Sequence, residues 1–112
     1  MNEAKLYRLI YKYAQTEQGK WLNDFKWADI PIILISKLPG EIAGAYGCGY
    51  ILLLDVDEKI IAPTYLHELR HRWQWHKQKI KYLLGKVFRP LIEKDAYREE
   101  EIFREYLNEQ ND

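Results

Sequence analysis

The first part of the chain alternates apolar and polar residues with a helical period. Over Glu3–Thr16 the apolar side chains recur three or four residues apart, at Leu6, Leu9, Ile10, Tyr13 and Ala14. Positions with this spacing share one face of an α-helix, so we predict a helix that buries this face. Gly19 is a suitable stop for it. The aromatic-rich segment Trp21–Trp27 that follows has no clear period.

The middle of the chain changes to a pattern typical of strands. Apolar and β-branched residues cover Ile30–Ile35, and a second apolar run covers Tyr50–Val56. Between them, Leu38-Pro39-Gly40 is typical of a turn, and Glu41–Tyr46 has the length of another strand. We therefore expect three strands in a small, mostly antiparallel sheet, with Gly47-Cys48-Gly49 as a turn or bulge.

A helical period returns in the second half of the chain. Pro63 suits a first helical turn, because the N–H that it lacks would have no partner there, and the pattern continues over Thr64–Lys79. Gly85 and Pro90 interrupt it, and a last helix is expected over Leu91–Asn108. The order helix, three strands, helix, helix predicts an α+β fold.

Length and composition set the class of protein. The 112 residues suit one compact domain, residues 1–112, and 47% of them are hydrophobic and 14% aromatic, which argues against a disordered chain. The single cysteine, Cys48, cannot form an internal disulfide. No apolar run has the length of a membrane span or secretory signal, so we expect a cytoplasmic protein without membrane contact. Charged residues make up 30% of the chain, and this amino-acid usage resembles that of proteins from thermophiles.

Candidate chemistry lies inside the second predicted helix, as His67-Glu68-Leu69-Arg70-His71. Residues four apart lie on the same face one turn apart, so both imidazoles can bind one zinc ion. Glu68 is offset beside the metal, where its carboxylate can take a proton from a metal-bound water. The competing interpretation is a surface helix whose histidines and glutamate pair with charges. The helical context favours the metal.

A catalytic zinc ion takes three protein ligands and leaves one position open for water. One zinc-binding pattern continues on the same segment with a glycine and then a third histidine. Here the glycine position holds Gln74 and the histidine position holds Lys77, and His76 is one residue out of register. The next acidic residues are Glu93 and Asp95. We expect Glu93 as the third ligand. Asp95 is its competitor, two positions on and therefore on a different helix face.

These residues resemble the gluzincin metallopeptidases, and more narrowly the minigluzincins, which are soluble peptidases of about this size. The resemblance extends over residues 42–97 and is carried by Ala43–Leu54, by the HExxH sequence and by Glu93-Lys94-Asp95-Ala96. The same residues are also similar to the catalytic cores of CaaX-protease-like membrane peptidases. The resemblance implies one Zn²⁺ per chain on His67, His71 and Glu93, with Glu68 as general base and acid in peptide hydrolysis.

The resemblance also assigns roles outside the HExxH sequence. It implies that Ala45 and Tyr46 lie in the sheet edge strand that pairs with an extended peptide or unfolded protein substrate. Many relatives have an aspartate four residues after the glutamate ligand, where it orients a histidine, but this chain has Tyr97, whose phenol carries no charge. Tyr97, His76 and Arg98 are unranked candidates for the donor that stabilises the oxyanion.

Charge is unevenly distributed along a chain that is neutral overall. Residues 70–89 hold seven Lys or Arg and no acid, whereas residues 93–112 hold eight acids and three bases. These opposite charges attract each other within one chain or between two, and we expect a homo-oligomer. Because minigluzincins are zymogens, the resemblance implies that the segment Tyr97–Gln110, amphipathic through Ile102, Phe103, Tyr106 and Leu107, obstructs the active site. The alternative is a core helix with a solvated acidic face.

Two other classes of function stay open. One is a catalytically silent module that binds zinc and engages a protein partner. The other is a nucleic-acid binder that uses the basic residues 70–89 and nearby aromatics. The equal numbers of basic and acidic residues, 17 of each, argue against the second.

Overall fold

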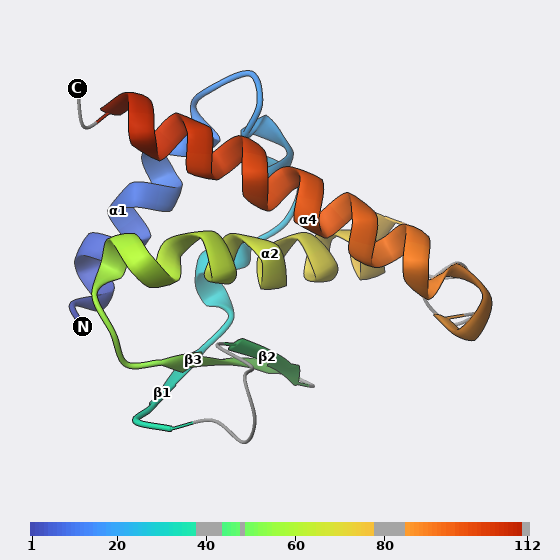
Figure 1. Ribbon diagram of the computed structural model, residues 1–112, viewed down its shortest axis with the longest axis horizontal. Helices are drawn as coiled ribbons and strands as arrows, with labels where there is room; N and C mark the ends of the chain where they lie inside the picture. The colour runs from blue at the N-terminus through green and yellow to red at the C-terminus, as the bar shows by residue number, and fades with distance from the viewer. Residues whose placement is uncertain (38–43, 48, 78–84, 111–112) are drawn as a thin grey trace.

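The computed structural model describes residues 1–37, 44–47, 49–77 and 85–110. These described residues form three α-helices, three strands and two short 3-10 helices (Figure 1). Their bounds are α1 Glu3–Ala14, η1 Lys20–Asp24, η2 Trp27–Asp29, β1 Ile32–Ile35, β2 Gly44–Gly47, β3 Tyr50–Leu54, α2 Glu58–Lys77 and α4 Gly85–Gln110. The α+β class is confirmed. In Figure 1, α2 runs through the middle, between α4 and the sheet.

Helix α1 matches its prediction closely. Asn2 caps it by accepting a hydrogen bond from the Lys5 N–H at 3.2 Å, and the predicted face is buried at Leu6, Ile10, Tyr13 and Ala14. The helix ends at Ala14, two residues earlier than expected. A Cβ at Gly19 would overlap the carbonyl oxygen of Tyr13, so the turn after α1 requires glycine.

The sheet has the strand order β1-β3-β2, with β3 in the centre. Strand β3 pairs antiparallel with β2 and parallel with β1, where Ile32 lies opposite Ile51 and Ile35 opposite Leu54. The prediction of a mostly antiparallel sheet is therefore wrong. It assumed that strands adjacent in sequence pair as hairpins, but β3 lies between β1 and β2. The expected turn at Leu38-Pro39-Gly40, the first residues of Glu41–Tyr46, and Cys48 lie outside the described residues.

Both long helices begin before their prolines. Helix α2 begins at Glu58, where the Asp57 carboxylate accepts a hydrogen bond from the Lys59 N–H at 2.9 Å, so Pro63 lies in the second turn instead of the first. Helix α4 begins at Gly85 and contains Pro90. Each proline is the sixth residue of its helix, where it removes one backbone hydrogen bond and its ring crowds the carbonyl four residues earlier, and both helices nevertheless continue through it.

The core lies between α1, β3, α2 and the second half of α4. It contains side chains such as Leu6, Ile10, Trp21, Leu22, Ile51, Leu53, Ile61, Tyr65, Leu66, Leu69 and Phe103. The ring of Phe103 lies 4.7 Å from that of Tyr13, and this contact joins α4 to α1. Among the described helices, none is both long and apolar enough to cross a lipid bilayer.

Candidate metal centre

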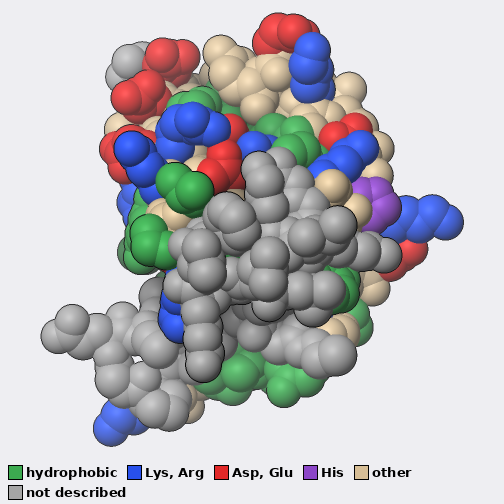
Figure 2. Space-filling model, turned by 90° about the vertical axis from the view of Figure 1, so that its right-hand side faces the viewer, with side chains coloured by type: hydrophobic (Ala, Val, Ile, Leu, Met, Phe, Trp, Pro, Cys, Tyr) green, Lys and Arg blue, Asp and Glu red, His purple; other side chains and the backbone are tan. Residues whose placement is uncertain are grey.

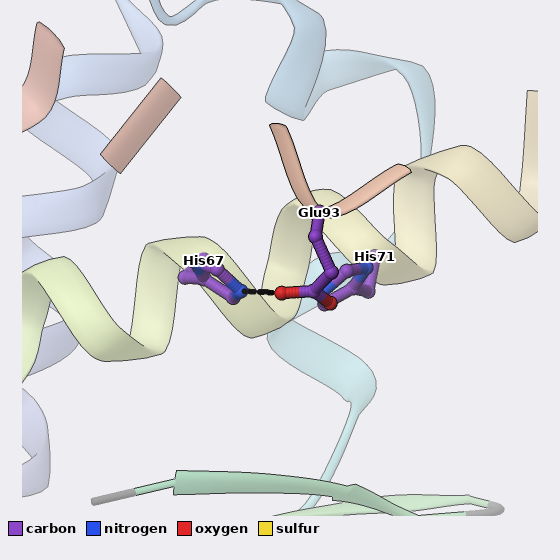
Figure 3. A group of neighbouring side chains, drawn as sticks. All are labelled: His67, His71 and Glu93. Carbon is purple, nitrogen blue, oxygen red and sulfur yellow. Dashed lines mark hydrogen bonds and ion pairs between the residues drawn. The ribbon is translucent and has the colours of Figure 1, made fainter. Parts of the chain in front are cut away.

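Two histidines of α2 and one glutamate of α4 converge (Figure 3). His67 and His71 are buried, and their Nε2 atoms lie 3.2 Å apart. Glu93 reaches them from the neighbouring helix, with Oε1 2.7 Å from Nε2 of His71 and Oε2 3.4 Å from Nε2 of His67. One ligand atom from each residue can be chosen so that all three lie within 4.8 Å of one another. The structure thus brings together the three residues predicted as ligands.

This donor set can hold a divalent metal ion. Two imidazoles and one carboxylate are a typical set for catalytic zinc, and other first-row transition metals accept the same donors. Burial lowers the pKa of the His71 imidazole, although Glu93 acts in the opposite direction, and the neutral imidazole is the form that binds metal.

Glu68 lies in the same turn of α2 as His67 and is buried. Burial raises the pKa of its carboxyl to about 7; the charge of His67 lowers this value, and Glu93 and Glu100 raise it. A carboxyl group that titrates near neutrality can both take up and release a proton during a reaction.

Asp95, the competitor for the third ligand position, is engaged elsewhere. Its two carboxylate oxygens accept hydrogen bonds from Arg70 at 2.7 and 3.2 Å, and Oδ2 accepts another from Nε2 of Gln74 at 2.9 Å. Burial opposes ionisation here, but these hydrogen bonds hold the pKa of Asp95 below its usual range. Glu93 is therefore the acidic residue of the pair that faces the histidines.

Arg70 joins three elements around the site. Its guanidinium carbon lies 3.8 Å from the ring centre of Trp73 and 4.8 Å from that of Trp21, while its nitrogens bind Asp95. The side chain is buried, so cation–π contacts and the ion pair compensate for its lost hydration. Sequence analysis assigned no role to this variable position of HExxH.

The outer ring nitrogen of each histidine also has a partner. Nδ1 of His67 lies 2.9 Å from Oε1 of Glu100, and Nδ1 of His71 lies 2.9 Å from Oε1 of Gln74. The amide nitrogen of Gln74 donates to the carbonyl of Ile92 and to Asp95, which leaves its oxygen to accept from His71. Each Nδ1 therefore carries a proton and each Nε2 can bind metal.

The roles of Glu100 and Gln74 were not predicted from the sequence. Burial lowers the pKa of His67, but the hydrogen bond to Glu100 and the nearby carboxylates raise it overall. The signal for Glu100 was its spacing, since positions 93, 97 and 100 share one face of a helix. Gln74 carried no such signal, because its role depends on where the carbonyl of Ile92 lies.

No protein-family model, curated protein or solved structure matches this chain. The resemblance to gluzincins therefore rests on the motif residues of the sequence alone.

The three candidates for the oxyanion donor lie in different surroundings. The ring of Tyr97 lies edge-on to that of His67 at 4.5 Å between centres, and 59% of this residue is exposed. His76 stacks on Phe25, and Arg98 donates to Asp95. Of these three, Tyr97 is the residue in contact with a candidate ligand.

Ala45 and Tyr46 lie in β2, at one edge of the sheet, opposite Leu52 and Ile51 of β3. Strand β2 also lies against α2, which carries the two histidines. The edge position that the resemblance implied for Ala45 and Tyr46 agrees with the strand order of the described sheet, and their role toward a substrate stays a prediction.

Charge on the described surface is mixed. At the end of the molecule where α4 begins, the described acidic and basic side chains are interspersed (Figure 2). Within the basic stretch of residues 70–89, Arg70 is buried against Asp95 and Lys77 lies 3.7 Å from Asp24. Two of the seven basic residues of this stretch, Arg70 and Lys77, are thus paired with acidic residues.

Proposed function

We propose that this protein is a zinc-dependent metallopeptidase, with His67, His71 and Glu93 as ligands of one Zn²⁺. The observation that carries the proposal is the approach of Glu93, from a separate helix, to within 2.7 Å of His71 Nε2. Two imidazoles and one carboxylate make three ligands, and a zinc ion held by them would keep a fourth position for water, as catalytic zinc sites do. Bound zinc supplies a Lewis acid that polarises the scissile carbonyl and makes water a better nucleophile.

Glu68 is the proton carrier in this proposal. Its carboxylate takes a proton from the water whose oxygen attacks the carbonyl carbon, and gives that proton to the amine as the C–N bond breaks. In the metal-free protein burial raises the pKa of this carboxyl to about 7, and the charge of a bound zinc ion would lower that pKa, so that the carboxylate can accept the proton. Tyr97, which lies against His67, is the candidate that we favour for an oxyanion donor.

The substrate in this proposal is an extended peptide or an unfolded protein segment. Strand β2 lies at the edge of the sheet, and an edge strand can pair with an added strand through backbone hydrogen bonds. The backbone of Ala45 and Tyr46 would align the peptide alongside α2.

Latency and self-association remain predictions. Phe103 is fully buried, and Ile102, Tyr106 and Leu107 pack against the core, so the second half of α4 has a structural role whatever else it does. Truncation after Tyr97 would remove both Phe103 and Glu100 and is therefore a poor test of latency. Substitutions on the exposed face of α4 leave the core intact. Their effect on turnover tests latency, and their effect on the number of subunits, measured by sedimentation, tests self-association.

The experiment measures bound zinc and hydrolysis of an unfolded protein substrate by the wild type and three variants. Glu68→Gln should retain zinc and lose about 10²-fold or more of turnover, because it cannot carry the proton. Glu93→Ala should lose both zinc and turnover. Glu105→Ala, which removes an exposed carboxylate of α4, is the control and should lose neither. A wild type that takes up no zinc, even when zinc is added, would contradict the proposal.

The second candidate is a catalytically silent zinc module that binds a protein partner. On α4, Leu91 is 64% exposed and Tyr97 is 59% exposed, so both side chains are available for contact with a partner. This candidate predicts stoichiometric zinc with no turnover in the wild type or any variant.

A further inference from the structure

The outer nitrogen of His67 faces a carboxylate that is itself held in place. Oε1 of Glu100 lies 2.9 Å from Nδ1 of His67, and Oε2 accepts a hydrogen bond from Nη2 of Arg104 at 2.8 Å. Both oxygens of Glu100 are therefore engaged, and its side chain is mostly buried. Such a carboxylate cannot rotate away from His67 without breaking the contact with Arg104.

Helix geometry explains why Glu100, and not the residue at position 97, makes this contact. Glu93, Tyr97 and Glu100 lie on one face of α4, four and three residues apart. Glu93 faces Nε2 of the imidazoles, Tyr97 packs against the ring of His67, and Glu100 reaches Nδ1 from one turn further along. A single face of α4 thus contacts His67 at both of its nitrogens.

The two histidines differ in the charge of their partners. His71 donates to the amide oxygen of Gln74, which is neutral, whereas His67 donates to a carboxylate. A carboxylate acceptor fixes the tautomer and makes the imidazole a more basic ligand, and loss of such a partner typically costs 10- to 100-fold in metal affinity.

We propose that Glu100, fixed by Arg104, is a positioning residue that holds Nε2 of His67 toward the metal and strengthens His67 as a ligand. This inference rests on the metal site of the proposed function, but it does not require peptide hydrolysis.

The test measures the affinity of the full-length protein for Zn²⁺ and Co²⁺ by competition with a chromophoric chelator, and records the absorption spectrum of the Co²⁺ form. Glu100→Gln should weaken binding about 10-fold and Glu100→Ala 10- to 100-fold, with a changed cobalt spectrum. Arg104→Ala should act in the same direction with a smaller effect, because it frees Glu100 to move. Glu105→Gln, on an exposed position of the same helix, is the matched control and should leave affinity and spectrum unchanged.

The outcomes separate this inference from the proposed function. Thermal unfolding of the metal-free variants shows whether each is folded at the temperature of the titration, and the Gln and Arg104 variants serve if Glu100→Ala is not. Wild-type affinity in folded Glu100 variants overturns the role of Glu100 and leaves the metal centre standing. A wild type that binds no metal overturns both. Metal binding that weakens as expected in a protein without turnover supports Glu100 and contradicts the peptidase.

Discussion

The two halves of α2 are equally buried but by different means. The first half buries apolar side chains such as Ile61, Tyr65 and Leu66. These side chains pack with α1, β3 and Phe103, and we call this group the apolar layer. The second half buries polar side chains, namely His67, Glu68, Arg70, His71 and Gln74. Together with Glu93, Asp95 and Glu100 of α4, they form what we call the polar layer.

The difference teaches where stability and chemistry come from. In the apolar layer, burial of apolar area stabilises the fold, and the partner need only fit in shape. In the polar layer, most of the buried groups require specific partners, because an unpaired polar atom costs free energy. Most of these partners come from α4, so the docking of this helix both completes the fold and assembles the candidate site.

The largest effect is expected in the apolar layer, from Phe103→Ala. The ring is fully buried and contacts Tyr13 and Tyr106, so its removal should lower the free energy of unfolding by about 3–5 kcal/mol. Urea titration followed by circular dichroism measures this value. Ile60→Ala, at a position that is 68% exposed, is the control and should change it by less than about 0.5 kcal/mol. A small loss at Phe103 would mean that α4 is not anchored by the apolar layer.

A gain of stability is expected in the polar layer from Glu68→Gln in metal-free protein. The pKa of Glu68 is about 7 in the fold, above the usual 4.5, because burial disfavours the charged form. The wild type therefore loses stability as pH rises from about 4.5 to 7, and the glutamine variant escapes this loss. The gain at pH 8 should be about 3 kcal/mol and should vanish below about pH 4.

Thermal unfolding across this pH range, with a chelator present, measures the effect of Glu68→Gln. Glu101→Gln, which removes a largely exposed carboxylate of α4, provides the comparison and should show no such pH-dependent gain. Equal stability of wild type and Glu68→Gln at pH 8 would show that the polar layer does not penalise this charge.

The smallest of the three effects is expected from Gln74→Leu. The variant keeps a similar volume but removes the acceptor of His71 Nδ1 and the donor to Ile92 and Asp95. Unsatisfied buried groups should lower the free energy of unfolding by about 1–3 kcal/mol. Denaturant titration beside Gln18→Leu, an exposed position, gives the comparison. No loss would mean that water replaces Gln74 without cost.

Local pattern was enough to predict α1 and the candidate ligands. The face of α1 follows from a period of 3.6 residues, and the two histidines follow from a spacing of four on a helix. Glu93 was expected because it is one of the two acidic residues that come next in the chain, with Asp95 as its competitor. These features depend on the geometry of a single helix or on the order of elements, which a sequence displays directly.

The features that sequence analysis missed depend on contacts between distant segments. The parallel pairing of β1 with β3 is decided by which strand occupies the centre of the sheet. The early starts of α2 and α4 show that a proline marks a permitted position near a helix start and not the start itself. The roles of Gln74 and Arg70 exist only once α4 has packed on α2.

Glu93 and Phe103 lie on one unbroken helix, α4, about 15 Å apart along its axis at a rise of about 1.5 Å per residue. Inserting or deleting one residue between them would turn Glu93 by about 100° relative to Phe103 and point its carboxylate away from the imidazoles. The length of this stretch therefore fixes the angle between the metal-facing and core-facing sides of α4, and a change of one residue in length should disturb the site more than substitution of an exposed side chain.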